Sequence, residues 1–251
     1  MQTKIVIGNW KMYKTEDEMR AFLQELSQKW QDNAPSEKTW LGLAVPYTLI
    51  NSAQTCCQEH QLAIHIGAQN MHDASSGAFT GEIALEMLQD RGAEFVILGH
   101  SERRSLFGES NEFINKKVKK ALSCEFKAVL CVGESQQEHL AGQTSKVLED
   151  QLAGCLQGVE TFQPGSLLIA YEPSWAIGTG QIADHEHIQS AHGACFEWLQ
   201  KRFPQQAISL LYGGSVSERN ASAIYALSHV DGVLVGGSSL KPKDFFALIA
   251  N

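Results

Sequence analysis

The sequence lacks any long apolar run: no stretch of its 251 residues approaches the roughly 18 apolar residues that a membrane-spanning helix needs. It also lacks an excess of basic charge, because 20 lysines and arginines stand against 28 aspartates and glutamates and give a net charge of -8. This balance disfavours nonspecific binding to nucleic acid or to an anionic membrane. We therefore predict no nucleic-acid partner and no membrane partner, and any anion site must be local.

Proline, linkers and cysteine motifs are scarce as well. Only six prolines occur, and no Pro/Ser-rich or low-complexity stretch divides the chain, so we predict one domain over residues 1–251. The six cysteines form no Cys-x-x-Cys pair and have no histidines at zinc-finger spacing, which predicts reduced thiols and no metal. Residues 1–10 contain no apolar core of a signal peptide. We expect a cytoplasmic protein.

Eight short runs rich in valine, isoleucine and leucine recur along the chain. Short, continuously apolar runs are typical of strands buried on both faces, as in a parallel sheet, whereas a half-exposed antiparallel strand alternates with polar residues. We predict these strands at residues 4–7, 41–45, 62–66, 94–98, 127–132, 167–171, 208–212 and 232–235.

Amphipathic helical patterns alternate with these strands. The clearest places Met19, Phe22 and Leu26 on one stripe, directly after a Thr-x-x-Glu capping box at residues 15–18. Weaker helical patterns follow near residues 48–59, 81–90, 110–124, 144–158, 184–202, 217–228 and 242–250.

The regular alternation predicts the fold. Eight units in 251 residues average about 31 residues each, the size of a minimal βα repeat. This favours the α/β class and a single-domain (β/α)8 barrel with eight parallel strands. A doubly wound open sheet is the alternative, but no Gly-x-Gly-x-x-Gly motif follows the first strand. In such a barrel the functional residues lie in the loops after the carboxyl ends of the strands.

Three of these loops carry a reactive side chain. Lys11 follows the first strand, and taken on its own it is more readily explained as a solvated surface charge. His100 follows the fourth strand at an expected helix start, where it is either a simple cap or a neutral imidazole that can polarise a carbonyl. Glu172 follows the sixth strand and precedes a segment with two glycines, which indicates a base beside a mobile loop or merely an exposed carboxylate.

Paired glycines follow the last two strands, in Gly-Gly-Ser at residues 213–215 and again at 236–238. Glycine lets the backbone approach a ligand closely, and backbone N–H groups at a helix start attract an anion. One pair alone is typical of a tight turn. Two pairs at successive strand ends favour a phosphate site, which barrels commonly hold at this position.

Seven motifs occur in a fixed order along the chain, and together they resemble the triosephosphate isomerase family from residue 4 to about residue 240. They are Gly-Asn-Trp-Lys (8–11), Gly-Ala-Gln-Asn (67–70), Gly-Ala-Phe-Thr-Gly-Glu (77–82), Gly-His-Ser-Glu-Arg-Arg (99–104), Tyr-Glu-Pro-x-Trp-Ala-Ile-Gly-Thr-Gly (171–180), Tyr-Gly-Gly-Ser (212–215) and Leu-Val-Gly-Gly (234–237).

The resemblance implies a reaction and the residues that perform it. The reaction is interconversion of dihydroxyacetone phosphate and glyceraldehyde 3-phosphate through an enediolate, in glycolysis and gluconeogenesis, without a cofactor. Glu172 would be the base, neutral His100 the donor to the substrate oxygen, and Lys11 a fixed positive charge beside Asn9. Glu102 would orient Lys11 through an ion pair.

The family pattern also implies a phosphate grip, a closing loop and a partner. Backbone groups near Gly178, Ser215, Gly236 and Gly237 would bind the phosphate, and Ile177 and Leu234 would cover Glu172 when the loop closes. Residues 71–80 resemble a protruding loop through which the family forms homodimers, with Thr80 near the partner subunit's Lys11.

The sequence departs from the family pattern at several points, namely at Tyr13, Lys14, Ser174, Gln181, Ile182, Ser238 and Ser239. These positions concern the first loop, the two ends of the closing loop and the phosphate site. The histidines other than His100 follow no pattern, and we expect them at the surface.

Two other functions compete with the isomerase. One is a different sugar-phosphate isomerase on the same barrel, and the other is a noncatalytic phosphate-binding barrel. A binding protein would need the glycines, but it has no use for Lys11, His100 and Glu172 together at three strand ends. The sequence therefore favours the isomerase.

Overall fold

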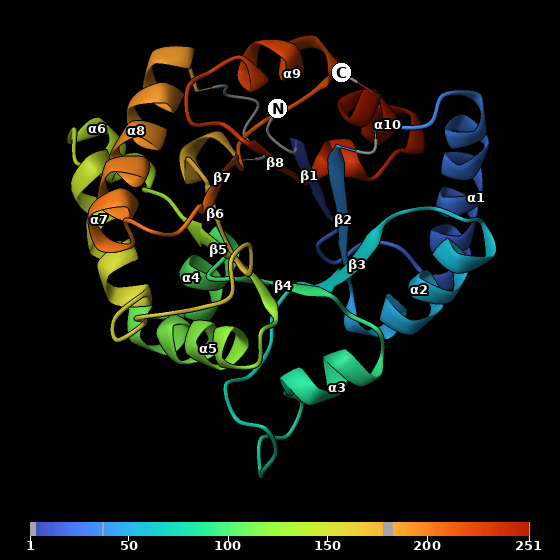
Figure 1. Cartoon of the computed structure of the whole chain (residues 1–251), viewed down its shortest axis with the longest axis horizontal. Helices are drawn as coiled ribbons and strands as arrows, with labels where there is room; N and C mark the ends of the chain where they lie inside the picture. Colours follow the sequence, from blue (N-terminus) through green and yellow to red (C-terminus); the bar gives the residue numbers. More distant parts are fainter. Residues whose placement is uncertain (1–3, 37, 178–182, 251) are drawn as a thin grey trace.

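A computed structural model of the chain describes residues 4–36, 38–177 and 183–250. Eight parallel strands form a closed barrel in sequence order, because β1 pairs with both β2 and β8 (Figure 1). The predicted (β/α)8 fold is therefore confirmed. The strands are β1 (Lys4–Asn9), β2 (Thr39–Val45), β3 (His65–Ala68), β4 (Phe95–Leu98), β5 (Lys127–Val132), β6 (Leu167–Tyr171), β7 (Ser209–Tyr212) and β8 (Gly232–Val235).

Helices surround the barrel and follow the strands in the chain (Figure 1). No helix in the described part of the chain is long and apolar enough to cross a membrane. The α-helices are α1 (Glu16–Asp32), α2 (Ile50–Glu59), α3 (Leu85–Asp90), α4 (Ser101–Phe107), α5 (Asn111–Ser123), α6 (Gln136–Leu140), α7 (Thr144–Cys155), α8 (His185–Arg202), α9 (Glu218–Tyr225) and α10 (Pro242–Ala250), and single 3-10 turns are η1 (Tyr47–Leu49), η2 (Ser174–Ala176) and η3 (Gly237–Ser239).

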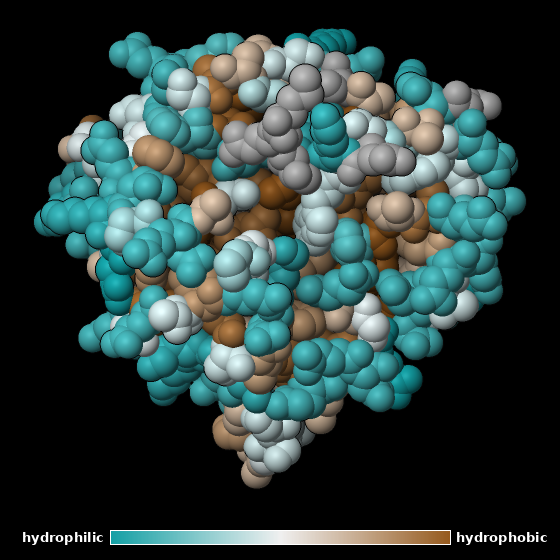
Figure 2. Space-filling model, viewed as in Figure 1, coloured by the Kyte–Doolittle hydropathy of each residue, from teal (hydrophilic) through white to brown (hydrophobic). Residues whose placement is uncertain are grey.

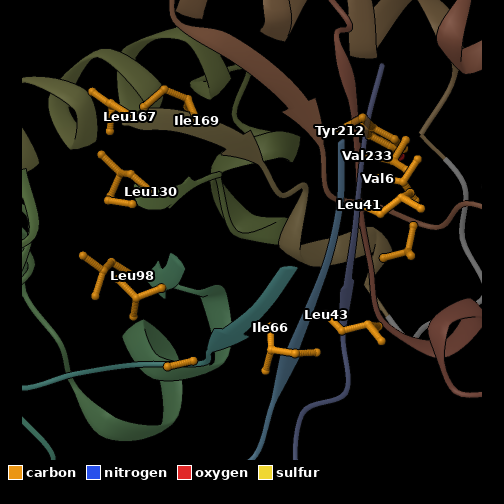
Figure 3. Packing of buried hydrophobic residues seen from close by; sticks show 14 of the residues in the cluster. Val6, Leu41, Leu43, Ile66, Leu98, Leu130, Leu167, Ile169, Tyr212 and Val233 are labelled. Carbon is orange, nitrogen blue, oxygen red and sulfur yellow. The ribbon is translucent and has the colours of Figure 1, made fainter. Parts of the chain in front are cut away.

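The continuous apolar character of the strands comes from burial on both faces. In β1, Ile5 and Ile7 belong to the cluster inside the barrel, whereas Val6 belongs to the cluster between the strands and the helices. Figure 3 shows this outer cluster, with side chains contributed by strands around the barrel. Inside, a side chain at Gly67 would lie only 2.4 Å from the ring of Phe95, so glycine is needed there.

Local sequence signals explain most element boundaries. The capping residue Glu18 accepts a hydrogen bond at Oε2 from the backbone N–H of Thr15 at 2.7 Å, as the motif before α1 predicts. Ser110 and Asp184 cap α5 and α8 in a similar way, by accepting from the backbone N–H groups of Phe113 and His187.

Several elements differ from the prediction; for example, α3 begins at Leu85 and not at residue 81. The third strand was expected at residues 62–66, but β3 begins at His65, because the N–H of Leu62 donates to the carbonyl of Cys57 and closes the turn after α2. Leu62 and Ile64 are buried in this loop, so the apolar run continues outside the strand. Helix α6 was not predicted, since five residues are too few to show helical periodicity.

Candidate active site

Glu172 directly follows β6 and is buried, with 2% of its surface exposed. Its backbone N–H donates to the carbonyl of Val132, which fixes the end of the strand beside β5. Oε2 of the carboxylate accepts a hydrogen bond from the backbone N–H of Ser101 at 2.9 Å, and Oε1 lies 3.1 Å from Nε2 of His100. The start of α4 therefore holds the carboxylate, since helix N-termini favour negative charge.

His100 is the residue that caps α4, and its hydrogen bonds indicate its protonation state. Nδ1 accepts from the backbone N–H of Glu102 at 3.2 Å, so this nitrogen carries no proton. The proton of the neutral ring then lies on Nε2, which is 3.1 Å from Oε1 of Glu172. A neutral imidazole aimed in this way can donate to a developing oxyanion.

Lys11 lies at the end of β1 in a left-handed backbone conformation, with φ of 52°. Two amide side chains support this conformation: Oδ1 of Asn9 accepts from the N–H of Lys11 at 3.0 Å, and Nε2 of Gln69 donates to its carbonyl at 2.8 Å. Nζ of Lys11 lies 2.6 Å from Oε1 of Glu102, so the predicted ion pair is present. The lysine is therefore positioned by three other residues.

These side chains share one cavity of about 410 Å³, which opens among the loops after the strands. Two side-chain hydroxyl groups connect the loops that line this cavity. Ser215 donates to the carbonyl of Ala176 at 2.9 Å, and Ser238 donates to the carbonyl of Val216 at 2.5 Å. A cavity of this size can hold a small molecule. Its lining includes Asn9, Lys11, His100, Glu172, Ile177, Ser215, Leu234, Gly236 and Gly237.

The structure describes some of the other residues that the sequence analysis singled out, but not all of them. Gly178, Gln181 and Ile182 lie outside the described residues. Ser174, where the sequence departs from the family pattern, donates through Oγ to the carbonyl of Glu134 at 2.6 Å. Ser239 is buried and donates to the carbonyl of Gly236 at 2.6 Å, next to the expected phosphate position.

The sequence analysis assigned no role to two residues that contact the site. Gln69 belongs to the Gly-Ala-Gln-Asn motif at residues 67–70, so its motif was a signal, whereas Ser101 contributes a backbone N–H that no side-chain pattern reveals. Glu134 does not line the cavity that Glu172 lines, but it is a carboxylate just after β5 and so occupies a position where functional residues are expected.

A carboxylate, a neutral imidazole and a lysine around one cavity at the carboxyl end of a parallel barrel define an enzyme that moves protons on a small, negatively charged substrate. The family model described as triosephosphate isomerase matches residues 4–251. The chain belongs to the triosephosphate isomerase family, and the predicted resemblance is confirmed.

Individual relatives agree over nearly the whole length. The chain is 43% identical over 248 residues to "Triosephosphate isomerase" of Protochlamydia amoebophila (strain UWE25). The aligned residues make up 98% of this chain and 92% of that protein. It is 38% identical over 252 residues to the protein of the same name from Alkaliphilus oremlandii (strain OhILAs), covering 99% of each chain. The protein of that name from Chlamydia felis (strain Fe/C-56) is 41% identical over 250 residues, covering 98% of this chain and 96% of its own.

Proposed function

We propose that Glu172, His100 and Lys11 together catalyse the interconversion of dihydroxyacetone phosphate and D-glyceraldehyde 3-phosphate, the aldose–ketose isomerisation of glycolysis and gluconeogenesis. The observation that carries this proposal is the arrangement of Glu172 and His100, whose Oε1 and Nε2 lie 3.1 Å apart in a cavity that Lys11 also lines. A base for a carbon-bound proton and a donor for the adjacent oxygen are thus available to one substrate.

The reaction needs no external electron acceptor, because a proton moves between neighbouring carbons while the substrate keeps all its electrons. Glu172 removes a proton from one carbon, and the carbonyl oxygen becomes an enediolate oxygen. His100 donates a hydrogen bond to that oxygen, while Lys11 and Asn9 stabilise its negative charge. The hydroxyl proton on the neighbouring oxygen is passed to this enediolate oxygen by way of His100, and Glu172 then returns its proton to the neighbouring carbon, whose partner carbon becomes the new carbonyl.

The phosphate would be held at the other end of the cavity. Gly236, Gly237 and Ser215 line this end, and Gly178 is proposed to join them from outside the described residues. Backbone N–H groups bind phosphate without a charged side chain. Fixing the unreactive end of the substrate positions its carbons against Glu172.

We also propose a homodimer. Residues 71–80 project away from the barrel between β3 and α3, and the tip of this projection carries apolar and weakly polar side chains (Figures 1 and 2). A second cavity of about 380 Å³, lined by Met12, Tyr47 and Phe107, adjoins Lys11. Met12 and Phe107 are 95% and 66% exposed, so docking of the partner's loop would bury large apolar side chains.

Domain organisation and location complete the proposal. Residues 1–251 are proposed to form one domain, which is supported by the pairing of β1 with β8 in one barrel. A cytoplasmic location is supported by cysteines that are all free, since oxidising compartments favour disulfides. The net charge of -8 supports the absence of a nucleic-acid partner.

A coupled assay of glyceraldehyde 3-phosphate conversion tests the catalytic role of Glu172. The Glu172→Asp variant keeps the carboxylate but withdraws it by one methylene, so we expect kcat to fall by about 10²-fold or more with a smaller change in KM. The matched control is Glu160→Asp, which shortens an exposed carboxylate and should leave kcat unchanged.

The same assay separates the alternatives. A wild-type protein that binds inorganic phosphate but converts no triose phosphate would be a noncatalytic barrel. Conversion of another sugar phosphate at a higher kcat/KM would indicate a different isomerase. An unchanged kcat in Glu172→Asp would exclude Glu172 as the base.

A further inference from the structure

Three metal-ligating side chains gather outside the catalytic cavity. Glu134 follows β5, His139 lies in α6, and His187 lies in the first turn of α8. Nε2 of His187 is 3.1 Å and Nδ1 of His139 is 3.9 Å from Oε1 of Glu134, and one ligand atom from each residue lies within 4.8 Å of the others. Figure 1 draws α6 and α8 as neighbours, and the two imidazole centroids are 4.7 Å apart.

We propose that Glu134, His139 and His187 form a binding site for a divalent transition-metal ion such as Zn²⁺. Two imidazoles and one carboxylate are a donor set that binds Zn²⁺ and leaves one position open. Metal–ligand bonds of about 2.0–2.1 Å in tetrahedral geometry place the donor atoms about 3.3 Å apart. The separations of 3.1 Å and 3.9 Å from Oε1 of Glu134 bracket this value, and the two imidazole ligand atoms lie within 4.8 Å of each other, so the three atoms are close to the spacing that one ion requires.

The carboxylate of Glu134 is prepared for a cation. Its side chain is completely buried, and Oε1 accepts hydrogen bonds from the Tyr171 hydroxyl at 3.0 Å and from Nε1 of Trp175 at 2.7 Å. Oε2 has no hydrogen-bond partner among the described residues. The two histidines face Oε1, so these contacts orient the carboxylate for an ion bound on the Oε1 side.

The histidine side chains leave the site accessible from solvent. The side chains of His139 and His187 are 31% and 18% exposed, which leaves a path from solvent to the ligand atoms.

The site touches the segment that follows the catalytic base. The N–H and Oγ of Ser174 both donate to the carbonyl of Glu134, and the Trp175 ring stacks on His139 with centroids 4.2 Å apart. An ion that joins Glu134 to α6 and α8 would restrict movement of this segment. This consequence rests on the proposed isomerase function, whereas metal binding does not.

Metal binding is measured first, without reference to activity. The background is Cys124→Ser, because Cys124 is an exposed thiol that could bind metal on its own. Chelator-treated protein is titrated with Co²⁺, followed by visible absorption, and with Zn²⁺, followed by calorimetry. We expect one ion per chain, with the strong visible bands of Co²⁺ in a site of low coordination number.

His139→Gln and His187→Gln should each weaken Zn²⁺ binding at least about tenfold, and the double variant should abolish it. Glutamine keeps an amide that can donate to Glu134, so both variants should fold, which far-UV circular dichroism checks. The control is His65→Gln, which removes a histidine that pairs with Glu94 at 2.6 Å in a two-residue contact. It should bind Zn²⁺ like the background.

Three results distinguish the metal site, its coupling to catalysis and the proposed isomerase function. Equal Zn²⁺ affinity in His187→Gln and the background, or no binding at millimolar Zn²⁺, would overturn the site. Zn²⁺ should lower kcat more than it changes KM, reversibly with EDTA, and only where the site is intact; binding without this effect would refute the coupling alone. A metal-free wild type without isomerase activity would refute the proposed function while leaving the binding result intact.

Discussion

At the scale of single residues, two buried histidines show how local partners decide a role. His100 uses both ring nitrogens, one toward Glu102 and one toward Glu172. His192 donates from Nδ1 to the carbonyl of His229 at 2.8 Å, and its Nε2 has no partner in the described part of the chain. The prediction of a surface histidine is wrong for His192, because α8 turns it into the core.

His192 makes the stability of the protein depend on pH. Burial lowers the pKa of His192 to about 4, from a reference value of 6.5. Between these values the unfolded chain binds a proton that the folded chain does not, so stability falls as pH falls from 6.5 to 4. The shift corresponds to a loss of about 3 kcal/mol from this residue.

Urea unfolding at pH 7, 5.5 and 4.5 measures this effect. His192→Asn should be less stable at pH 7, because it leaves space in the core, but its stability should fall less steeply with acid than that of the wild type. The exposed control His185→Asn should keep the wild-type slope. Parallel curves for the wild type and His192→Asn would contradict the argument.

At the scale of elements, the segment from Pro173 to Ile177 connects Glu172, the proposed base, to the rest of the cavity. The 3-10 turn η2 forms its middle, and Ser174 hydrogen-bonds to Glu134. Ile177 lines the same cavity as Glu172. In the proposed mechanism this apolar side chain shields the enediolate from water.

The Ile177→Ala variant tests this shielding. We expect kcat to fall about tenfold or more, equivalent to about 1.4 kcal/mol of transition-state stabilisation, with a much smaller change in substrate affinity. Steady-state kinetics measures both quantities. Ile208→Ala, an equal truncation beside the start of β7, should leave kcat unchanged, and an unaltered kcat in Ile177→Ala would refute the role.

At the scale of the whole molecule, the surface of a single chain exposes several large apolar side chains. Large side chains are exposed around the second cavity, including Met12 and Phe107, and Phe79 is 48% exposed in the projecting loop. His72 packs against Phe79 with ring centroids 4.2 Å apart, which orders the loop before any partner binds. A preordered loop loses less entropy on association.

The Phe79→Asp variant tests the homodimer. A charge at this position would have to be buried in the proposed interface, so we expect the mass measured by light scattering to fall to that of one chain, with reduced activity. Leu140→Asp is the control, since Leu140 is exposed on α6, away from the projecting loop. A variant of Phe79 that keeps the mass of two chains would place the interface elsewhere.

The amino-acid sequence was enough to predict the barrel and the edge at which Lys11, His100 and Glu172 gather. Strands buried on both faces require continuous apolar runs, so runs such as 127–132 and 167–171 marked β5 and β6 directly. Lys11, His100 and Glu172 were recognisable because parallel barrels gather their strand ends at one edge. Periodicity failed where a loop is buried, as at Leu62.

Only the tertiary structure decided which groups touch. The backbone N–H of Ser101 reaches Glu172 from 71 residues away, and Gln69 reaches Lys11 from 58. His187 approaches Glu134 across 53 residues, which is why no spacing motif predicted the proposed metal site. Sequence periodicity reports which side of an element is buried, whereas contacts between elements depend on how the closed barrel brings separate loops together.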